Sequence, residues 1–227
     1  MFPQGMVKPF ISIIIATYNR SRILKRAIDS VCAQTYSHWE LIIVDDRSTD
    51  DTVELLAGIL TGITNHKITI FPLDGHQGLA AARNKGIELV QGDFVTFLDS
   101  DDRYEKNHLE SHAQIIQQYP QIDFFYGGVQ VIGRKYVPDI ERPGFQINVD
   151  NCVVGGTFFI RKSVLNGVGG FPYKQFGEDY ALFHFIKEKG YSMMQVPLQT
   201  YIYDRTEDDC LTKAKVLMKA DLSSVPE

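Results

Sequence analysis

The chain has 227 residues, of which 44% are hydrophobic and 22% are charged, and these proportions predict one globular domain with a sizeable core rather than a disordered chain. Its 23 basic and 28 acidic side chains give a net charge of −5, which argues against nucleic acid as a partner. The apolar run over residues 10–16 is far shorter than the ~20 residues of a membrane span, so we expect no transmembrane segment.

Buried strands and helices alternate regularly through the first part of the chain. Continuous β-branched or apolar runs predict buried strands, and apolar residues spaced three and four apart predict helices. The expected strands cover residues 10–16, 41–44, 67–73, 94–98 and 124–131, and the expected helices cover residues 22–34, 50–60, 79–90 and 106–119. This alternation predicts an α/β fold with a Rossmann-like, mostly parallel sheet and helices on both faces.

Residues 132–205 are less regular than residues 1–131. Glycines and prolines interrupt residues 132–151, where we expect loop or short edge strands. Beyond them, the expected strands cover residues 157–160, 192–196 and 199–203, and the expected helices cover residues 162–168 and 178–189. The tail, residues 206–227, is expected to be helical from 212 to 219. We therefore expect a single domain over residues 1–227, with a smaller mixed region after the regular sheet.

Polar clusters come directly after three of the expected strands. Thr17 and Tyr18 follow the first strand, Asp46 follows the second, and the run from Asp99 to Asp102 follows the fourth. The carboxyl ends of parallel strands meet at one edge of a sheet, and ligands of such folds bind there. These side chains are therefore expected to lie along a single rim.

The tetrad Asp99-Ser100-Asp101-Asp102 holds three carboxylates, which repel one another unless a cation or solvent relieves them. Carboxylate oxygens suit Mg²⁺ or Mn²⁺, and Mg²⁺ is commonly held by one or two carboxylates together with substrate phosphates. The tetrad therefore indicates a divalent metal site. A solvated acidic turn that caps the following helix is the alternative.

Other polar residues near the rim have two interpretations each. Tyr18 offers an aromatic face on which a base can stack, or it is an ordinary half-buried tyrosine. Asp45 and Asp46 can accept hydrogen bonds from a base or a ribose, or they form a turn and cap a helix. Arg83 suits a phosphate or carboxylate partner, or it makes a surface salt bridge.

Glu178 and Asp179 follow a glycine-rich loop, at the expected start of a helix. A carboxylate there can act as a general base, or it can cap the helix. Two nucleotide-binding motifs are absent from the sequence, since no GxxxxGK[ST] loop occurs and no GxGxxG follows the first strand. P-loop and dinucleotide-binding folds are therefore not expected.

Four segments, in order, carry a family resemblance. They are ISIIIATYNR, WELIIVDDRSTDDT, GLAAARNKGIELVQGDFVTFLDSDD and VGGFPYKQFGEDYALFHFIKEKGY. Together they resemble the inverting family 2 glycosyltransferases of GT-A fold, over nearly all of residues 10–203. The resemblance implies that the protein transfers a hexosyl or N-acetylhexosaminyl group from a nucleoside diphosphate sugar to an acceptor hydroxyl. A UDP-sugar is the expected donor.

The resemblance also gives roles to individual donor-side residues. By resemblance, Thr17 and Tyr18 line the nucleobase pocket. Asp46 then contacts the base, usually uracil, and Arg83 lies near the donor. These roles make the rim at the strand ends a nucleotide-sugar site.

The segment Asp99-Ser100-Asp101 resembles the DXD element of the family. By this resemblance Asp101 is the direct ligand of Mn²⁺ or Mg²⁺, and Asp99 faces the ribose or the donor sugar, with Ser100 in the same nucleotide-sugar site. Asp179 matches the catalytic base of the family, which takes the proton from the acceptor hydroxyl.

Two positions depart from the family pattern. His76 stands where relatives often have Asn, two residues before Gly78. The stretch from Tyr203 to Glu207 lacks the histidine with which many relatives approach the metal or diphosphate, and Arg205 is the candidate to replace it. Because this histidine is missing, one alternative stays open. The chain could be a non-catalytic module that binds a sugar nucleotide or a partner and has lost turnover. A nucleotidyltransferase on a related sheet is a further alternative, although no basic glycine-rich loop follows the first strand.

The expectations for partners and location follow from the same resemblance. Residues 1–131 are expected to bind the nucleotide sugar, and residues 132–205 to face a saccharide, lipid-linked or other hydroxyl acceptor. Three widely spaced cysteines without a CxxC pair are typical of reduced thiols in the cytoplasm. We therefore expect a cytoplasmic protein of polysaccharide biosynthesis, with peripheral contact at the inner face of the membrane left open.

Overall fold

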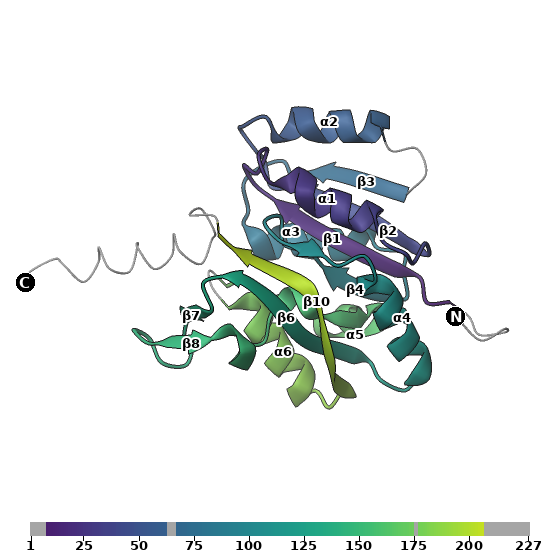
Figure 1. Ribbon diagram of the computed structural model, residues 1–227, viewed down its shortest axis with the longest axis vertical. Coiled ribbons are helices and arrows are strands. Elements are labelled where there is room, and N and C mark those ends of the chain that lie inside the picture. Colours follow the sequence, from purple (N-terminus) through teal and green to yellow (C-terminus); the bar gives the residue numbers. More distant parts are fainter. Residues whose placement is uncertain (1–7, 63–66, 175–176, 207–227) are drawn as a thin grey trace, which may run out of the picture.

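The computed structural model describes residues 8–62, 67–174 and 177–206 (Figure 1). One sheet of eight strands runs through it, in the order β3-β2-β1-β4-β9-β6-β10-β5. Its strands are β1 (Ile11–Thr17), β2 (Trp39–Asp45), β3 (Lys67–Pro72), β4 (Phe94–Phe97), β5 (Arg103–Tyr104), β6 (Phe124–Gly133), β9 (Phe159–Arg161) and β10 (Met193–Arg205). The helix expected at residues 212–219 lies outside the described residues.

The sheet is mostly parallel, as the sequence predicted. The pairs β1–β2, β2–β3, β1–β4 and β6–β10 are parallel. Strand β9 lies antiparallel between β4 and β6, and the short strand β5 lies antiparallel on β10. The reversal at β9 separates the regular strands of the first half from the mixed part that follows.

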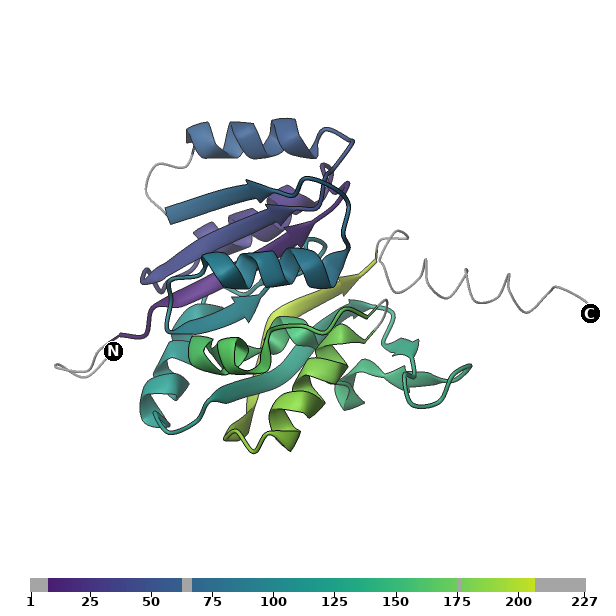
Figure 2. The same ribbon diagram turned by 180° about the vertical axis from the view of Figure 1, so that it is seen from behind.

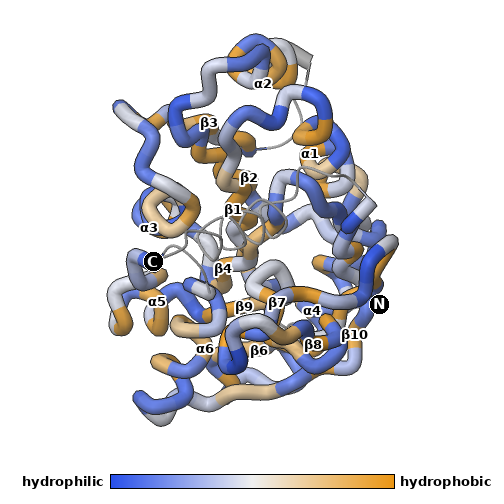
Figure 3. The backbone as a smooth tube through the Cα atoms, turned by 90° about the vertical axis from the view of Figure 1, so that its left-hand side faces the viewer, coloured by the Kyte–Doolittle hydropathy of each residue, from blue (hydrophilic) through white to orange (hydrophobic). Residues whose placement is uncertain are grey.

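Helices cover both faces of the sheet (Figures 1 and 2). Side chains of α1 (Leu24–Cys32), α2 (Thr52–Gly62) and α4 (His108–Gln118) pack in one hydrophobic cluster, and those of α3 (Leu79–Leu89), α5 (Lys162–Val168) and α6 (Glu178–Glu188) pack in the other. Successive side chains of β1 alternate between the two, since Ile13 and Ile15 belong to the first cluster and Ile14 to the second. In Figure 3 the central strands are largely orange, whereas the helices carry both colours, as expected for elements with one buried face.

Three strands differ from the sequence prediction. Residues 192–196 and 199–203, predicted as two strands, belong to the single strand β10, whose register shifts between Val196 and Tyr201. Strand β5 was not predicted, because two residues are too few to show a periodic pattern. The strand expected at residues 157–160 starts only at Phe159, since Gly155–Thr157 form a 3₁₀ turn.

The segment expected as loop or short edge strands contains a separate antiparallel hairpin. Its strands are β7 (Tyr136–Pro138) and β8 (Gln146–Asn148), which pair with each other and not with the main sheet. A 3₁₀ turn, Val149–Asn151, follows it. The hairpin projects from the body of the molecule in Figures 1 and 2. No helix in the described part of the chain is long and apolar enough to span a membrane.

The strand ends define the edge at which the site is built. Strands β1, β2 and β4 are parallel neighbours, so their carboxyl ends lie side by side. Thr17 pairs with Asp45 in the last register position of β1 and β2, and the backbone N–H of Asp46 donates to the Thr17 carbonyl at 2.8 Å. Asp99 follows β4 after one further residue. The segments predicted to share one rim therefore do so.

Candidate functional site

A cavity of about 490 Å³ opens beside the carboxyl edge of the sheet. Five of the predicted site residues line it, namely Arg83, Asp99, Ser100, Asp101 and Asp179. Residues 137–142 of the β7–β8 hairpin line it as well. Thr17, Tyr18 and Asp46 do not line this cavity, although Ala16 and Arg20, their neighbours in the chain, do. The predicted residues therefore form two adjoining groups.

The acidic tetrad after β4 divides its carboxylates between the cavity and the core. Asp99 and Asp101 line the cavity, while Asp102 is completely buried. The Tyr201 hydroxyl donates to Asp102 Oδ2 at 2.6 Å, and the Asp204 N–H donates to Oδ1 at 2.8 Å. Burial, reinforced by the carboxylates of Asp101 and Asp99, raises the pKa of Asp102 well above its usual range. The tetrad is therefore not a solvated turn, and only two of its three acidic residues line the cavity.

Arg83 is a buried bridge between two segments of the site. Its Nη2 donates to Asp99 Oδ1 at 2.6 Å, and its Nη1 donates to Glu178 Oε1 at 3.1 Å. Burial by itself would lower the pKa of Arg83, but the carboxylates of Asp99, Glu178 and Asp179 outweigh it and raise that pKa. Because Arg83 is only 4% exposed, the alternative of a surface salt bridge is wrong. The guanidinium instead ties the end of β4 to the start of α6.

Asp179 lies in the first turn of α6 and faces the cavity. Its Oδ2 accepts a hydrogen bond from the Gly155 N–H at 3.1 Å, and its Oδ1 accepts one from the Tyr180 N–H at 2.8 Å. Burial raises the pKa of Asp179, and the neighbouring Glu178 carboxylate adds to the effect, which Arg83 and the two hydrogen bonds only partly offset. A carboxylate with a raised pKa at a cavity wall can accept a proton from a ligand hydroxyl.

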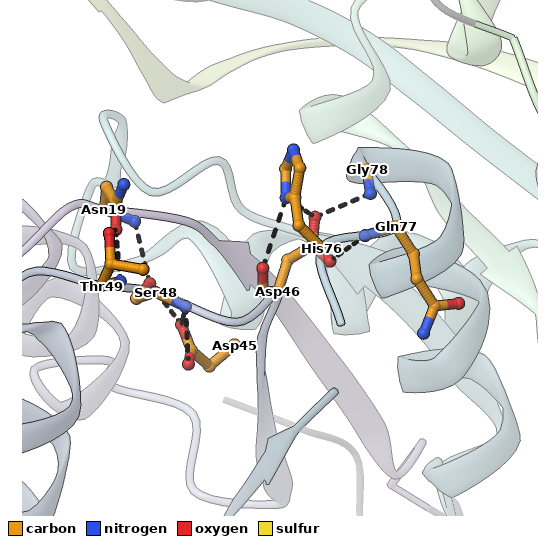
Figure 4. A network of polar contacts seen from close by, with 8 residues as sticks. All are labelled: Asn19, Asp45, Asp46, Ser48, Thr49, His76, Gln77 and Gly78. Atoms are coloured by element: carbon orange, nitrogen blue, oxygen red, sulfur yellow. Dashed lines mark hydrogen bonds and ion pairs between the residues drawn. The ribbon is translucent and has the colours of Figure 1, made fainter. Parts of the chain in front are cut away.

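Asp46 is engaged with the segment that leads into α3 (Figure 4). Its Oδ1 accepts a hydrogen bond from the Gln77 N–H and its Oδ2 accepts one from the Gly78 N–H, both at 2.7 Å. The Nδ1 of His76 lies 2.9 Å from Oδ2. Gly78 is the residue before the first turn of α3 and has a φ of 90°, which favours glycine. Asp46 thus binds the two backbone N–H groups that come directly before the first residue of α3.

Tyr18 and His76 form a stacked pair next to Asp46. Their ring centroids are 4.0 Å apart with the planes inclined by 25°, and 38% of the Tyr18 surface is exposed. Thr17 is buried, and its Oγ1 has no hydrogen-bond partner among the described residues. His76, which departs from the family pattern, therefore contacts two residues predicted for the nucleobase pocket, Tyr18 and Asp46.

The loops after β1 and β2 are tied to each other. The carboxylate of Asp45 accepts hydrogen bonds from the backbone and hydroxyl of Ser48, so Asp45 forms a turn. Asn19 Oδ1 accepts a hydrogen bond from the Thr49 N–H at 2.7 Å, and the Asn19 N–H donates to Ser48 Oγ at 2.9 Å (Figure 4). These contacts hold the segment that carries Tyr18 against the segment that carries Asp46.

Arg205, at the end of β10, also lines the cavity. It is only 8% exposed, and its Nε and Nη1 have no hydrogen-bond partner among the described residues. Buried guanidinium nitrogens are normally paired, so two unpaired ones at a cavity wall suit an anionic ligand. In the sequence, Arg205 was singled out because it lies in the stretch that lacks the histidine of many relatives. Tyr201, which holds Asp102, gave no signal, because it reads as an ordinary strand tyrosine.

The donor set at the cavity fits a metal ion that is shared with a ligand. Within residues 8–62, 67–174 and 177–206 no group of three or more His, Cys, Asp or Glu side chains is arranged to enclose a metal. Two acidic residues, Asp99 and Asp101, line the cavity. This arrangement suits Mg²⁺ or Mn²⁺ held by one or two carboxylates with the remaining positions filled by phosphate oxygens and water.

Several curated proteins are similar to this chain in sequence. The putative teichuronic acid biosynthesis glycosyltransferase TuaG of Bacillus subtilis is 39% identical over 111 residues, which are 49% of this chain and 43% of TuaG. The Escherichia coli UDP-Glc:alpha-D-GlcNAc-diphosphoundecaprenol beta-1,3-glucosyltransferase WfgD is 30% identical over 178 residues, which are 76% of this chain and 67% of WfgD. The alignment with TuaG thus spans less than half of that relative's length.

Solved structures and a family model agree with this similarity. Staphylococcus aureus TarS 1–349 in complex with UDP-GlcNAc superposes with a TM-score of 0.74 at 21% identity, covering 90% of this chain and 60% of that one. The mannosyltransferase PcManGT of Pyrobaculum calidifontis, in complex with GDP-Man and Mn²⁺, gives 0.71 at 16% identity, covering 100% and 67%. These likenesses show the GT-A fold. The model for Glycosyl transferase family 2 matches residues 12–169, and the chain belongs to that family.

Proposed function

We propose that the chain is an inverting, metal-dependent glycosyltransferase that moves a sugar from a UDP-sugar to an acceptor hydroxyl. The observation that carries this proposal is the cavity of about 490 Å³ lined by Asp99, Asp101 and Asp179. Its size is within the range of small-ligand sites. Sugar transfer from a nucleotide needs carboxylates that hold a metal on the diphosphate and a further carboxylate that takes a proton, and both kinds face this one space.

The nucleobase is proposed to bind beside Tyr18 and Asp46. The exposed part of the Tyr18 ring offers a stacking surface. Asp46 Oδ1 accepts one hydrogen bond, from the Gln77 N–H, and has a second lone pair for a base N–H. The buried, unpaired Thr17 Oγ1 lies next to them in the chain. Support for a nucleoside diphosphate sugar also comes from similar proteins, since TarS is described with UDP-GlcNAc and WfgD is named for UDP-Glc.

The diphosphate is proposed to lie between Asp101 and Arg205. Asp101 would be the protein ligand of Mn²⁺ or Mg²⁺, with Asp99 and Ser100 beside it. When bound, the cation neutralises charge that develops on the departing diphosphate. The two unpaired guanidinium nitrogens of Arg205 would donate hydrogen bonds to the same oxygens, in place of the histidine that many relatives carry. The Mn²⁺ complex of PcManGT supports the choice of metal.

Asp179 is proposed to be the general base. Its Oδ2 is oriented by the Gly155 N–H, and burial raises its pKa toward the range in which a carboxylate exchanges protons efficiently. Asp179 would take the proton from an acceptor hydroxyl as that oxygen bonds to the anomeric carbon. The diphosphate leaves from the opposite face of the sugar, so the configuration at that carbon inverts. Arg83 holds Asp99 and the start of α6 at a fixed spacing for this step.

The acceptor is proposed to enter along the β7–β8 hairpin. The hairpin brings four apolar residues to the cavity, Val137, Pro138, Ile140 and Ile147, together with the charged residues Asp139, Glu141 and Arg142. Such a wall suits a saccharide on a lipid carrier, and WfgD is named for an acceptor of this kind, GlcNAc-diphosphoundecaprenol. We therefore propose a role in polysaccharide biosynthesis in the cytoplasm, with peripheral contact at the inner face of the membrane.

A donor screen tests the proposal. The protein is heated with a panel of nucleotide sugars, with and without Mn²⁺, because a ligand that binds the folded state raises the melting temperature. A UDP-sugar is expected to stabilise the protein only with the metal, and Asp101→Ala is expected to remove the effect. Asp179→Asn should keep donor binding but lose transfer, whereas Asp29→Asn, an exposed carboxylate on α1, should change neither. Wild-type transfer by Asp179→Asn would disprove the assignment of the base.

A further inference from the structure

We infer that Tyr201, together with Asp102, is a positioning residue that fixes the Asp99–Asp101 turn relative to Asp179. The inference rests on the proposed function, since it concerns how the metal-binding turn and the base are held at one spacing. Tyr201 is on β10, about a hundred positions beyond the turn in the chain, and it is only 1% exposed. Neither Tyr201 nor Asp102 lines the cavity, so both act through other residues.

The Tyr201 hydroxyl is hydrogen-bonded to the turn in both directions. It donates to Asp102 Oδ2 at 2.6 Å and accepts from the Asp99 N–H at 3.3 Å. The hydroxyl thus contacts the first and last residues of the tetrad and closes it into a loop. The two carboxylates that remain, those of Asp99 and Asp101, are the ones that line the cavity.

The same end of the Tyr201 ring touches the segment that holds Asp179. A Cβ added to Gly156 would lie 2.2 Å from Tyr201 Cζ and 2.3 Å from its hydroxyl oxygen, a separation that real atoms do not tolerate. Glycine is therefore required at this position for the tyrosine to pass. The preceding residue, Gly155, donates its N–H to Asp179 Oδ2 at 3.1 Å.

The Tyr201 side chain consequently connects the turn that carries Asp99 and Asp101 with the segment that orients Asp179. Its hydroxyl sets the shape of the turn after β4, and its ring packs against the 3₁₀ turn Gly155–Thr157, which orients Asp179. Catalysis depends steeply on such spacing, because a displacement of about 1 Å can cost about 100-fold in rate. Residues that orient metal ligands commonly change metal affinity about 10–100-fold when they are mutated.

Tyr201→Phe is the direct test, and Tyr104→Phe is its matched control. Tyr201→Phe keeps the ring on Gly156 but removes both hydrogen bonds to the turn. Tyr104 is also buried, with its ring 5.8 Å from that of Tyr201, but its hydroxyl donates to the Phe97 carbonyl at 3.0 Å and does not contact the tetrad. Each variant loses one buried hydroxyl, and Tyr201→Phe should cost more stability because it leaves a buried carboxylate oxygen without its donor.

The measurement is UDP binding to the full chain at a series of Mn²⁺ concentrations, with melting temperatures recorded beside it. We expect Tyr201→Phe to raise the Mn²⁺ concentration needed for half-maximal UDP binding about tenfold, and Tyr104→Phe to leave it within about twofold. UDP affinity at saturating Mn²⁺ should stay near the wild-type value, which a general loss of structure would not allow. Asp102→Asn provides a second, milder variant, because its NH₂ group replaces one of the two oxygens that accept these hydrogen bonds.

The outcomes separate this inference from the proposed function. If Tyr201→Phe and Asp102→Asn keep the wild-type Mn²⁺ requirement, or shift it no more than Tyr104→Phe does, the positioning role is overturned while the proposed function stands. If the wild-type protein binds UDP equally well with and without Mn²⁺, the proposed function fails and the inference fails with it. If only Tyr201→Phe and Asp102→Asn need more Mn²⁺, both stand.

Discussion

Replacing Arg83 with Met is expected to destabilise the protein strongly and to alter the proposed base. The substitution keeps an apolar stem of similar length over Phe171, whose ring centre lies 5.0 Å from the guanidinium carbon. It removes the positive charge from between Asp99 and Glu178. The loss is therefore electrostatic rather than a loss of packing.

The two links of Arg83 differ in value because their partners differ in exposure. The Asp99 side chain is 32% exposed, so water would screen its charge once Arg83 is gone, and this link contributes little. The Glu178 side chain is only 10% exposed, so it would become a buried carboxylate without its partner. Breaking a buried pair from one side costs about 3–5 kcal/mol, of which we expect the lower end, about 3 kcal/mol. In a domain of this size that corresponds to a fall in melting temperature of roughly 6–12 °C.

Urea unfolding of the wild type, Arg83→Met and Lys25→Met measures this difference. Lys25 pairs with Asp29 on the surface of α1, with both side chains more than half exposed, so its loss should cost at most about 0.5 kcal/mol. Arg83 also lowers the pKa of Asp179, so its removal should shift the low-pH limb of transfer activity to higher pH. A loss below about 1 kcal/mol in Arg83→Met, or an unmoved limb, would refute the bridging role.

Three further predictions concern the proposed donor site and base. Because the pKa of Asp179 is raised, the rate of transfer should begin to decline, as the pH falls, at a pH above the usual aspartate range, where the base becomes protonated. Asp179→Asn should lower the rate about 10²–10⁴-fold in a turnover assay while UDP binding persists. Arg205→Gln should weaken UDP binding about tenfold or more by calorimetry. It should leave the melting temperature unchanged or higher, because it removes a buried cation of which two nitrogens have no hydrogen-bond partner among the described residues. Lower stability with intact binding would contradict this prediction. His76→Ala should remove a stacking contact with Tyr18 worth about 1 kcal/mol and weaken UDP binding about fivefold, whereas unaltered affinity would place the base elsewhere.

The rim of the site could be predicted because it depends on topology alone. Parallel strands end at one edge, so Thr17, Asp46 and Asp99 had to lie near one another once the alternation of strands and helices was recognised. The direction of each side chain could not be predicted in the same way. Asp101 and Asp102 are identical neighbours in sequence, yet one lines the cavity and the other is buried, because Tyr201 and the Asp204 backbone bind only the second.

Contacts between distant segments account for the other differences. Arg83 has the sequence signature of a surface helix residue, and its burial depends on Glu178, which lies 95 positions away. Residues 192–196 and 199–203 were predicted as two strands, but the chain resumes pairing with β6 at Tyr201 after a register shift. Local patterns do not contain this information, since pairing with β6 decides where β10 begins and ends.

The position of Mn²⁺ in a crystal of the protein grown with UDP tests the central claim most directly. Anomalous scattering identifies the metal without reference to activity or acceptor. We predict one strong peak in the cavity beside the Asp101 carboxylate, with the UDP diphosphate between the metal and Arg205 and the base next to Tyr18 and Asp46. UDP bound at the strand ends with no metal at Asp101, or a metal at a site remote from Asp101, would contradict it.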